Sequence, residues 1–598
     1  MNINTIHTLR ALLRYGCVSL CALQQKIAPE FDADFYVKTY SDVLKSGINP
    51  LVHYALWGIK EGRTVKKLDL TNTSELLRKA CKKGWVILTP ISCLFVAQSI
   101  KNALSEFGYS SKIIFDVPDN GYEDKLHLVI CPHVFKSLPS LYIVYQLEQS
   151  VSPRYFTSDY FDRLNRALVI LDYSKTNIKF LTDHGINYKK IFYLPLSLLH
   201  NYHHEAKHHY DYDLIFYGDT NNKRRQQILS RLSKICRLKV VCGLYGEDLY
   251  QEIKRSKAIL NIHYYENALL ETTRIYEALS LGKQVISERG SDQNQYSHLE
   301  DIVNFVDLGD ISALEDKVRN MVFLSDKDFS LQVRKLSEWE NRHGESFIFY
   351  FARMLLNFDL ITYEQFYKSV GQHYILDSNR VCLSLAETIG RRDYFEKTCP
   401  FVCTIFQGLR HEVSWIGCAL SYKFLLTKAR EQGFENILIC EDDTLFAKDF
   451  ERRFSLVNEF LNTHENWDIF NGVIAQILES ETKLINVTEY RGEEFLLINR
   501  MVSTVFNIYN HSIYDKLVGW DYRNRIQETN QIDQYIKRIA NLNILTVSPF
   551  LVGHAEDIVS TVWGLKNTIY SDMIAESEKK LKAMALNFVR TKREKDNI

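Results

Sequence analysis

The sequence predicts an α/β protein built from several domains. The chain has 598 residues, which is too long for one core at roughly 150 residues per domain. From residue 80 to about 570, short apolar runs alternate with stretches of helical periodicity, a pattern typical of parallel sheets covered by helices. This alternation restarts near residues 211 and 380, so we expect three successive α/β parts.

Composition narrows the function classes. Lys and Arg total 73 and so do Asp and Glu, so the formal net charge is +0 and nothing global attracts nucleic acid. The 12 cysteines form no CxxC pair, which favours reduced thiols in a cytosolic protein over a zinc site. No apolar run reaches the roughly 18 residues of a membrane-spanning helix. Local sites must therefore carry the function.

The N-terminal stretch leaves two interpretations open. Leu9–Leu23 is apolar but contains Arg10 and Arg14, and no acidic residue precedes Glu30. It lacks the small-residue cleavage site of a signal peptide. We expect either an ordinary packed helix or a basic amphipathic helix that makes peripheral contact with a membrane face.

Residues 31–63 form a recognisable helical segment. Apolar and aromatic residues recur at helical spacing, and Gly47, Asn49 and Pro50 divide the run into two short helices. The segment resembles a small module found at the N-terminus of many bacterial glycosyltransferases, so we assign residues 1–75 to such a module. The matching residues are Phe35, Tyr36, Tyr40, Asp42, Val43, Gly47, Pro50, His53, Tyr54, Gly58, Glu61, Gly62 and Arg63.

The α/β parts give the remaining domain boundaries. We expect two facing Rossmann-like lobes at 80–205 and 206–370, the second closed by helices after residue 330, because ligands bind beyond the carboxyl ends of such strands. Another α/β domain follows at 376–575. The stretch 576–598 is rich in Lys and Glu and predicts a solvated terminal helix.

A first candidate site follows the strand Leu214–Tyr217. Gly218 ends this strand and would let a ligand approach the backbone. Lys223 and Arg224 then open a helix, where backbone N–H groups and the helix dipole favour a phosphate. A basic solvated turn is the alternative.

Three charged residues downstream share one helical face. Glu271, Arg274 and Glu277 are spaced by three. A glutamate facing the crevice can accept two hydrogen bonds from vicinal hydroxyls, and an arginine can grip phosphate with two bonds. The alternative is a set of surface ion pairs.

These features resemble the C-terminal lobe of group 1 glycosyltransferases, which have the GT-B fold. The resemblance includes the motif R-x-x-E-A-x-x-x-G-x-x-V at 274–285 and spans roughly residues 80–345. It implies that Glu277 binds the nucleotide ribose, and that Lys223, Arg224 and Arg274 hold the diphosphate. It also implies that this unit needs no metal, because basic residues and helix dipoles neutralise the leaving group.

One departure from that family matters. A second glutamate is common eight residues before Glu277, but Leu269 stands there and Glu271 is out of register. This departure leaves open whether the lobe is catalytic or serves only to bind acceptor.

The second candidate site is an acidic triplet. The apolar run Ile437–Cys440 predicts a buried strand that delivers Glu441, Asp442 and Asp443 at its carboxyl end. Hard oxygen ligands at such a place suit Mn²⁺ or Mg²⁺, with a substrate diphosphate completing the coordination shell. An acidic turn that caps the following helix is the alternative.

Residues 380–560 resemble glycosyltransferase family 25, the lipopolysaccharide-biosynthesis type with a GT-A-like fold. The resemblance implies inverting transfer of a hexose, often galactose, from a UDP-sugar with a divalent metal. Tyr422 and Trp415 stand where the family commonly has histidine and glutamate. The matching residues are Leu383, Ser384, Leu385, Arg391, Arg392, Gly417, Cys418, Ala419, Leu420, Ser421, Glu441, Asp442 and Asp443.

Roles in this domain follow from the resemblance and from the residue types. Arg391, Arg392 and Asp442 are expected to bind the donor, and Glu441 and Asp443 to bind the metal.

Two later residues complete the expected site. An inverting transfer needs a general base, and Asp533 is our candidate because it opens a helix after a polar loop. His554 is a candidate late metal ligand. A helix cap and a packed histidine are the respective alternatives.

Together these features predict a bifunctional glycosyltransferase. The expected donors are nucleotide sugars, with UDP-hexose in the C-terminal domain, and the expected acceptor is a glycan or lipid-linked glycan of a bacterial surface polymer such as lipopolysaccharide or capsule. Donor supply places the enzyme in the cytoplasm or at the inner face of the membrane. Two alternatives remain: only the C-terminal domain is catalytic, or the chain is a non-catalytic glycan-binding protein.

Overall fold

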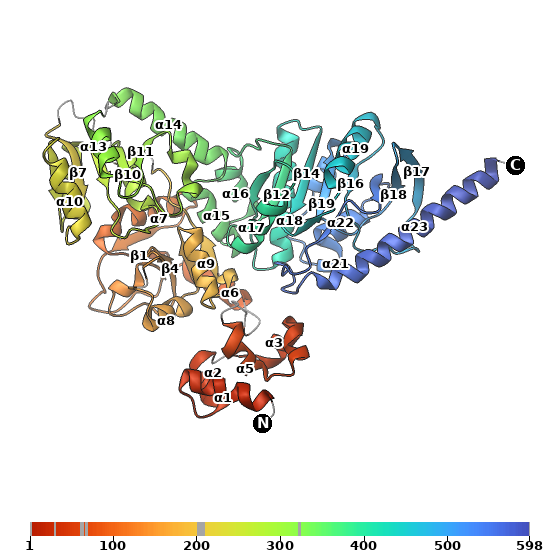
Figure 1. Ribbon diagram of the computed structural model, residues 1–598, viewed down its shortest axis with the longest axis horizontal. Helices are drawn as coiled ribbons and strands as arrows, with labels where there is room; N and C mark the ends of the chain where they lie inside the picture. The colour runs from red at the N-terminus through yellow and green to blue at the C-terminus, as the bar shows by residue number, and fades with distance from the viewer. Residues whose placement is uncertain are drawn as a thin grey trace. The chain divides into compact units, whose positions relative to one another are not determined.

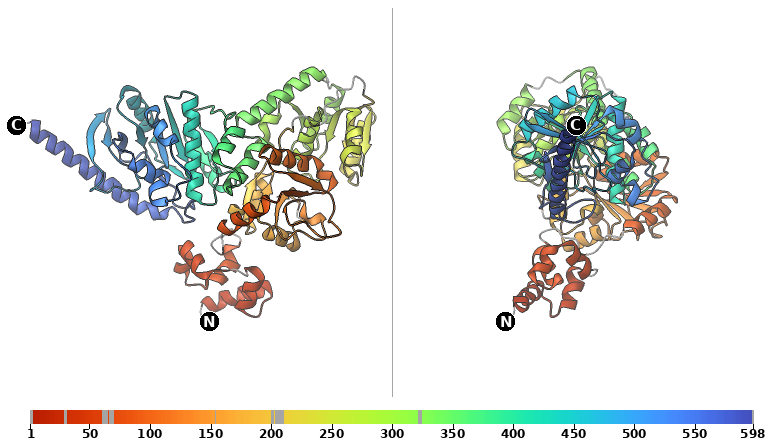
Figure 2. Two further views of the ribbon diagram at one scale, coloured as in Figure 1. Left: turned by 180° about the vertical axis from the view of Figure 1, so that it is seen from behind. Right: turned by 90° about the vertical axis from the view of Figure 1, so that its right-hand side faces the viewer.

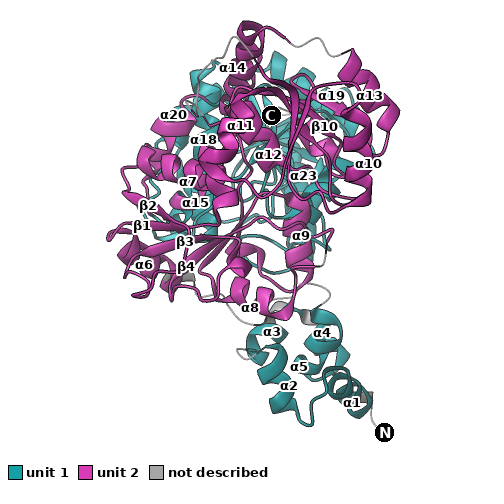
Figure 3. Ribbon diagram, turned by 90° about the vertical axis from the view of Figure 1, so that its left-hand side faces the viewer, with its two compact units in different colours: residues 1–71, 356–359, 374–598 teal, residues 72–355, 360–373 magenta. Residues whose placement is uncertain are grey.

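The computed structural model describes residues 3–28, 31–59, 65, 70–152, 154–199, 202, 210–320 and 324–596. The chain divides into two compact units (Figure 3). Unit 1 comprises residues 1–71, 356–359 and 374–598, and unit 2 comprises residues 72–355 and 360–373. The predicted boundary at 205/206 and the predicted module residues Glu61, Gly62 and Arg63 lie outside the described residues.

The N-terminal module consists of short helices. Its segment 31–59 is broken where the sequence predicts: Gly47 ends α4 with φ +63°, and Asn49 caps α5 by accepting from the N–H groups of Leu51 and Val52. The stretch before the break is itself divided at Tyr40, giving two helices where one is expected. The helices are α1 (Ile3–Tyr15), α2 (Leu20–Ile27), α3 (Ala33–Thr39), α4 (Ser41–Ser46), α5 (Pro50–His53) and the π-helical η1 (Tyr54–Gly58).

The first sheet of unit 2, to which the strands labelled β1 and β4 in Figure 1 belong, is parallel throughout, in the order β2-β1-β3-β4-β5-β6. Its inner strands are buried on both faces, as a parallel sheet between helices requires. Its elements are α6 (Leu70–Cys81), β1 (Trp85–Leu88), α7 (Leu94–Glu106), β2 (Ser111–Ile114), β3 (Leu126–Ile130), β4 (Tyr142–Gln146), α8 (Ser158–Arg166), β5 (Val169–Asp172), α9 (Lys175–Asp183) and β6 (Ile191–Tyr193).

The second sheet of unit 2 is also parallel, in the order β11-β10-β9-β7-β8, and forms a separate lobe (Figure 2). Leu214, Phe216 and Leu260 anchor its core against α10 and α13. Its elements are β7 (Tyr212–Tyr217), α10 (Lys223–Leu232), β8 (Leu238–Val241), α11 (Gly246–Lys254), β9 (Ser256–Asn261), α12 (Thr272–Ser280), β10 (Gln284–Glu288), β11 (Val303–Val306), α13 (Ile311–Arg319), α14 (Asp326–Arg342), α15 (Phe347–Asn357) and α16 (Tyr363–Phe366).

The C-terminal part of unit 1 has an eight-stranded mixed sheet, ordered β13-β12-β14-β19-β16-β20-β18-β17. β12 runs parallel to β13 and β14, whereas β14 and β19 are antiparallel. Its strands are β12 (Arg380–Ser384), β13 (Thr404–Gln407), β14 (Asn436–Glu441), β16 (Ile469–Asn471), β17 (Leu484–Tyr490), β18 (Glu493–Ile498), β19 (Phe506–Asn510) and β20 (Ile544–Ser548), and a separate pair is β15 (Thr444–Phe446) with β21 (Val552–His554).

The last helix differs from the expected solvated tail. The helix α23 (Thr568–Asp596) runs alongside β17 and continues past it (Figure 1), so the division expected at 575/576 falls inside one helix. Leu581 and Ala585 are buried, and Ser577 bonds the backbone at Ala475 and Ile477. The sequence did not indicate these buried apolar residues, because the segment is rich in Lys and Glu. The other helices are α17 (Ile389–Thr398), α18 (Ser414–Glu431), α19 (Phe450–Thr463), α20 (Tyr514–Val518), α21 (Gln527–Asn530) and α22 (Ile532–Arg538).

The predicted fold class is confirmed. The chain is α/β, with a helical N-terminal module, two parallel-sheet lobes and a further α/β domain.

Candidate active sites

The acidic triplet lies where the buried strand β14 ends. β14 is held between β12 and β19, and its last residue is Glu441. Asp442 and Asp443 form the turn into β15, whose first residue, Thr444, pairs with His554 of β21. This antiparallel pairing brings a histidine that is more than a hundred residues away beside the acids.

Both carboxylate oxygens of Asp442 already accept hydrogen bonds, from two partner residues. Ser384 donates to its Oδ2 at 2.7 Å, and Arg391 donates from Nε to Oδ1 at 2.8 Å and from Nη2 to the same oxygen. Burial raises the pKa of Asp442, and the guanidinium opposes that effect. The same Arg391 Nη2 lies 3.1 Å from Asp443 Oδ2. The predicted donor ligands Asp442 and Arg391 are therefore already paired with each other.

Asp443 keeps one oxygen unused. Its Oδ2 accepts from Asn567 Nδ2 at 2.9 Å and lies 3.9 Å from His554 Nδ1. Its Oδ1 and His554 Nδ1 are buried without a hydrogen-bond partner among the described residues. Burial raises the pKa of Asp443, but Arg391 and His554 outweigh it and bring the pKa below its ordinary value.

Glu441 faces a different set of partners. Its Oε1 accepts from Thr504 Oγ1 at 2.7 Å and from the Tyr422 hydroxyl at 3.1 Å. Burial, reinforced by Asp443, raises the pKa of Glu441 to about 7. Tyr422, the departure from the family pattern, thus contacts the triplet directly.

Asp533 lies near the triplet, on the first turn of α22. Burial raises the pKa of the Cys418 thiol, and the negative charges of Glu441, Asp533 and Asp443 raise it further. Burial also raises the pKa of Asp533 itself, whose Oδ1 accepts from the N–H of Gln534 at 2.7 Å. Asp533 and the predicted metal ligands Glu441 and Asp443 therefore act electrostatically on the same thiol, and the role of Asp533 as base stays a prediction.

Arg392 points elsewhere. It bonds Glu396 at 3.2 Å and the buried Gln407 at 3.2 Å, so it lies apart from the network of Arg391. Its donor-binding role stays a prediction.

The buried unpartnered atoms of Asp443 and His554 fit a cation, since buried polar atoms are almost always satisfied. A carboxylate with an imidazole is a donor set that suits Mn²⁺. Among the described residues, however, Glu441, Asp443 and His554 do not form a set whose ligand atoms all lie within 4.8 Å of one another. Asp443 and His554 are therefore the better ligands of the three.

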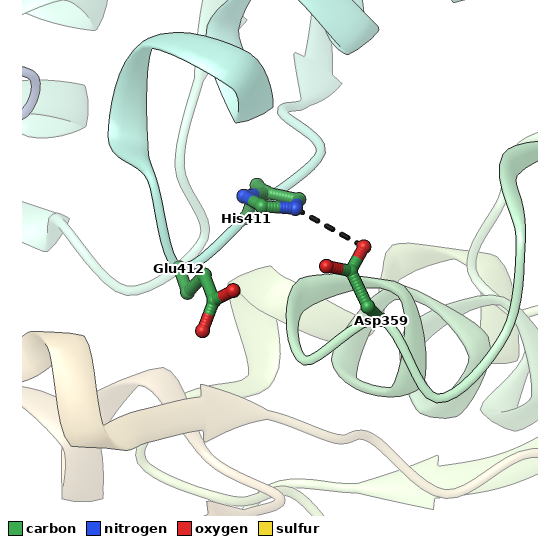
Figure 4. Close-up of side chains that lie close together, drawn as sticks. All are labelled: Asp359, His411 and Glu412. Atoms are coloured by element: carbon green, nitrogen blue, oxygen red, sulfur yellow. Dashed lines mark hydrogen bonds and ion pairs between the residues drawn. The ribbon is translucent and has the colours of Figure 1, made fainter. Parts of the chain in front are cut away.

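One other acid–histidine cluster exists in unit 1. In the described part of the chain, Asp359, His411 and Glu412 are the three residues whose ligand atoms lie within 4.8 Å (Figure 4). His411 Nε2 faces Asp359 Oδ1 at 3.2 Å, but Arg525 Nη1 also lies 2.8 Å from that nitrogen and bonds Asp359. A guanidinium already supplies the positive charge at this cluster.

In unit 2, the end of β7 brings a glycine and an arginine into contact. Gly218 has φ +138°, and a Cβ there would lie 3.3 Å from Arg274 Nη2. Arg274 donates to Asn261 Oδ1 at 2.7 Å and lies over the Tyr217 ring. Glycine thus permits the guanidinium to reach the strand ends.

The basic residues of α10 divide into three roles. Lys223 is exposed at the first turn. Arg224 donates to the Glu288 carboxylate and to the His263 carbonyl. Arg225, the third basic residue at this helix start, is buried and donates to the Ile262 carbonyl at 2.6 and 3.0 Å. Lys223 is therefore the exposed member of this group.

Glu277 of the motif and the out-of-register Glu271 have different surroundings. Glu277 is buried, and its two oxygens accept from Tyr217 at 2.9 Å and Tyr250 at 3.0 Å. Burial raises its pKa, and those hydrogen bonds oppose the effect. Glu271 instead lines an inter-lobe cavity of about 300 Å³, and its Oε2 lies 2.7 Å from Arg274 Nη1.

Sequence reasoning missed the partners that arrive from distant segments. Asn567 and the tyrosines that bind Glu277 carry no local motif. Glu271 had a signal, because it shares a helical face with Arg274, but family register argued against it.

One stretch of the chain matches a known protein family. Residues 412–518 match the sequence profile of the family described as glycosyltransferase family 25 (LPS biosynthesis protein). The matched stretch contains α18, β14 and the whole acidic triplet. The prediction of a glycosyltransferase is confirmed. A comparison with curated proteins finds no match.

Solved structures give weaker likenesses. Anabaena Alr3699/HepE in complex with UDP and glucose is 10% identical, with 46% of this chain and 100% of that chain covered and a TM-score of 0.31. The lipopolysaccharide outer core galactosyltransferase WaaB is 11% identical, with 42% and 95% covered and a TM-score of 0.26. TarM is 11% identical, with 36% and 50% covered and a TM-score of 0.25, so this chain spans half of its length. These values carry no argument about substrate.

No helix in the described ranges has the length and apolarity needed to cross a bilayer.

Proposed function

We propose that the C-terminal domain transfers a hexose from a UDP-sugar to a bacterial surface glycan such as lipopolysaccharide or capsule, with inversion and with Mn²⁺ or Mg²⁺. The observation that carries this proposal is the unpartnered pair of Asp443 Oδ1, which follows β14 within the stretch that matches family 25, and His554 Nδ1 on β21 beside it. UDP-galactose is our first candidate donor.

Each residue of the site has a proposed part in this reaction. Asp443 and His554 would hold the cation, which balances charge on the departing diphosphate. Arg391 keeps Asp442 and Asp443 in place through its ion pairs with both. Asp533 would accept the proton of the acceptor hydroxyl, since burial raises its pKa toward the range where a carboxylate works as a base.

We propose a second glycosyl transfer in unit 2, without a metal. The arginines around Glu271 and the exposed Lys223 supply positive charge at the strand ends where a diphosphate would bind. The alternative, a unit 2 that only binds acceptor, is favoured by one observation: both oxygens of Glu277, the expected ribose ligand, are taken by tyrosines.

The experiment is a screen of UDP-hexoses for turnover by the full chain, with Mn²⁺ and with EDTA. We expect UDP-galactose turnover that rises with Mn²⁺ and falls in EDTA to the metal-free rate proposed for unit 2, and a loss of about 100- to 1000-fold in the Mn²⁺-dependent part of the turnover in Asp443→Asn. Asp449→Asn is the matched control, because Asp449 is a half-exposed acid that pairs with Arg452. Equal turnover in both variants would refute the metal-site assignment.

We further propose that α1 contacts an anionic membrane surface at the cytoplasmic face. Ile6, Leu9 and Leu13 form one stripe and are 39, 44 and 80% exposed, and Arg10 and Arg14 run beside it. Amphipathic helices of this composition bind anionic lipid by burying the stripe while the basic groups meet headgroups.

Flotation with vesicles tests this contact. The full chain should float with vesicles that contain phosphatidylglycerol, and less with phosphatidylcholine alone. Leu9→Ser/Leu13→Ser should reduce flotation, whereas Leu44→Ser, which alters a residue 71% exposed on α4, should not. If the double variant instead changes only the oligomeric state, the stripe binds a second copy of the chain.

A further inference from the structure

Two glutamates from different lobes line the same cavity of unit 2, and Asp219 of the second lobe lines it with them. Glu148 follows β4 of the first lobe, and Glu271 precedes α12 of the second. Both line the cavity of about 300 Å³, together with the aromatic rings of Tyr155, Tyr264 and Tyr265. The cavity therefore lies beyond the carboxyl ends of both parallel sheets, where such folds bind substrates.

The loop that carries Glu148 is fixed to the loop before α12. Gln149 Nε2 donates to the Leu269 carbonyl at 3.3 Å, and Gln149 Oε1 accepts from the Leu269 N–H at 2.9 Å. This two-way bond between the lobes of unit 2 holds the two glutamates at one cavity.

A buried hydrogen-bond network holds the backbone carbonyl of Glu148 in place. Gln146 Nε2 and Asn177 Nδ2 each donate to the Glu148 carbonyl at 2.9 Å. The same two amides also bond Asp172, and all three of these side chains are fully buried. Three buried polar side chains thus hold the backbone of one glutamate, although burying them costs free energy unless each is satisfied.

His133 lies beside the Glu148 carboxylate. Its Nε2 lies 3.3 Å from Glu148 Oε1, and its ring packs against Tyr155 and Tyr160. Cys131, whose φ is +53°, starts the turn that carries it. His133 does not line the cavity, so it can orient Glu148 but does not face a substrate.

The two glutamates have opposite electrostatic surroundings. Burial raises the pKa of Glu271, but Arg274 and His263 outweigh it and bring the pKa to about 2. Burial raises the pKa of Glu148 to about 7, and Arg154 opposes this only partly. Two carboxyls held apart in this way can divide the work of charge stabilisation and proton transfer.

We propose that Glu148 is the residue of unit 2 that takes the proton from the acceptor hydroxyl, with His133 as its positioning residue. The proposal rests on the proposed glycosyl transfer in unit 2. The hydroxyl oxygen of the acceptor forms a bond to the anomeric carbon as the bond from that carbon to the diphosphate oxygen breaks. The proton goes to the Glu148 carboxylate, and the electron pair leaves with the nucleoside diphosphate.

The other charged and titratable groups near Glu148 are consistent with this role. His133 is kept neutral because burial, helped by Arg163, lowers its pKa. Arg154 attracts the ionised form of Glu148, and Tyr155 and Tyr160 have pKa values that burial raises above the ordinary range. The negative charge of Glu148 also acts to raise the pKa values of two thiols, Cys93 and Cys131. Within this group, burial brings the pKa of the Glu148 carboxyl to about 7.

The test uses the full chain in EDTA, which removes the metal that we propose for the C-terminal domain. Turnover of UDP-glucose and UDP-galactose is followed by UDP release, with water as the acceptor, and UDP binding is measured by calorimetry. Glu148→Gln should lose about 100-fold or more in turnover while UDP binding is retained. The wild-type rate should rise with pH to a plateau with a midpoint near 7, and Glu148→Gln should lack this rise.

Two further variants complete the design. Glu123→Gln alters a surface glutamate that pairs with Lys125 in the same lobe and should behave as wild type. His133→Gln should lose less turnover than Glu148→Gln.

The outcomes separate the inference from the proposed function. Undiminished turnover in Glu148→Gln, or a larger loss in His133→Gln, overturns the inference alone. UDP binding without turnover of either sugar at any pH overturns both the inference and the transferase role of unit 2.

Discussion

The two candidate sites handle negative charge in opposite ways. At the end of β14, three acids face one guanidinium, and the Asp443–His554 pair keeps unpartnered buried atoms. In unit 2, Glu271 is surrounded by Arg274 and Arg225, and Glu277 by two tyrosine hydroxyls.

This difference teaches how each site would meet a diphosphate. An acid-rich site repels a diphosphate until a cation joins them, whereas an arginine-rich site can attract one directly. The same donor class can therefore require a metal in one unit and none in the other, and the charge balance of the side chains indicates which.

The largest expected effect comes from the arginine that holds the acids. Arg391→Gln leaves Asp442 and Asp443 buried without their cation and should cost about 3–5 kcal/mol. Hydrogen exchange of peptides from β14 would measure it. Mn²⁺ at about 100 times its Kd should restore about 2.7 kcal/mol, because it binds only the folded site.

Matched variants sharpen that result. Arg430→Gln removes a surface pair with Asp515 and should cost less than about 1 kcal/mol. Arg274→Gln should destabilise unit 2 without rescue by Mn²⁺. Rescue of both Arg391→Gln and Arg274→Gln by the ion would erase the distinction between the sites.

The next largest expected effect is on metal affinity. His554→Gln removes the imidazole whose Nδ1 is buried and unpartnered among the described residues. We expect Mn²⁺ affinity to fall about 10- to 100-fold, measured by electron paramagnetic resonance on the full chain. His511→Gln, at an exposed histidine beside Glu435, is the control. Unchanged affinity in His554→Gln would remove histidine from the site.

The sequence predicted the strand that presents the acids, because an apolar run followed directly by three carboxylates is a local pattern. It also predicted the Rossmann-like lobes and the glycine at the end of β7. Asp442 and Arg391 were both identified, yet their pairing depends on how α17 lies against β14, which no local pattern encodes.

The positions of some site residues were harder to predict, because they depend on strand register or on register within a family motif. β21 places His554 opposite Thr444, so its position depends on a strand pairing across more than a hundred residues. Glu271 and Glu277 differ by less than two helical turns, and family register favoured the second. The sequence does not show which of the two is buried. In the structure Glu277 is buried and accepts hydrogen bonds from two tyrosines, whereas Glu271 lines the cavity.

A pH dependence of stability follows from Glu441, whose pKa is raised to about 7. From its ordinary pKa of 4.5 up to 7, the folded chain keeps a proton that the unfolded chain releases. Stability of the metal-free domain should therefore fall by about 1–2 kcal/mol as pH rises through this window, and change little above it. Hydrogen exchange of β14 peptides at pH 5 and pH 7.5 would measure the slope, which Glu441→Gln should abolish and Glu435→Gln should leave intact.

The smallest effect isolates one hydrogen bond of that same carboxylate. The Tyr422 hydroxyl donates to Glu441 Oε1 at 3.1 Å and lies 2.9 Å from the Thr504 carbonyl, while Thr504 Oγ1 supplies Glu441 with a second donor. Tyr422→Phe should therefore cost only about 0.5–1.5 kcal/mol. Because this hydrogen bond lowers the pKa of Glu441, its loss should move the pH window upward, and a downward shift would show that Tyr422 does not stabilise the ionised acid.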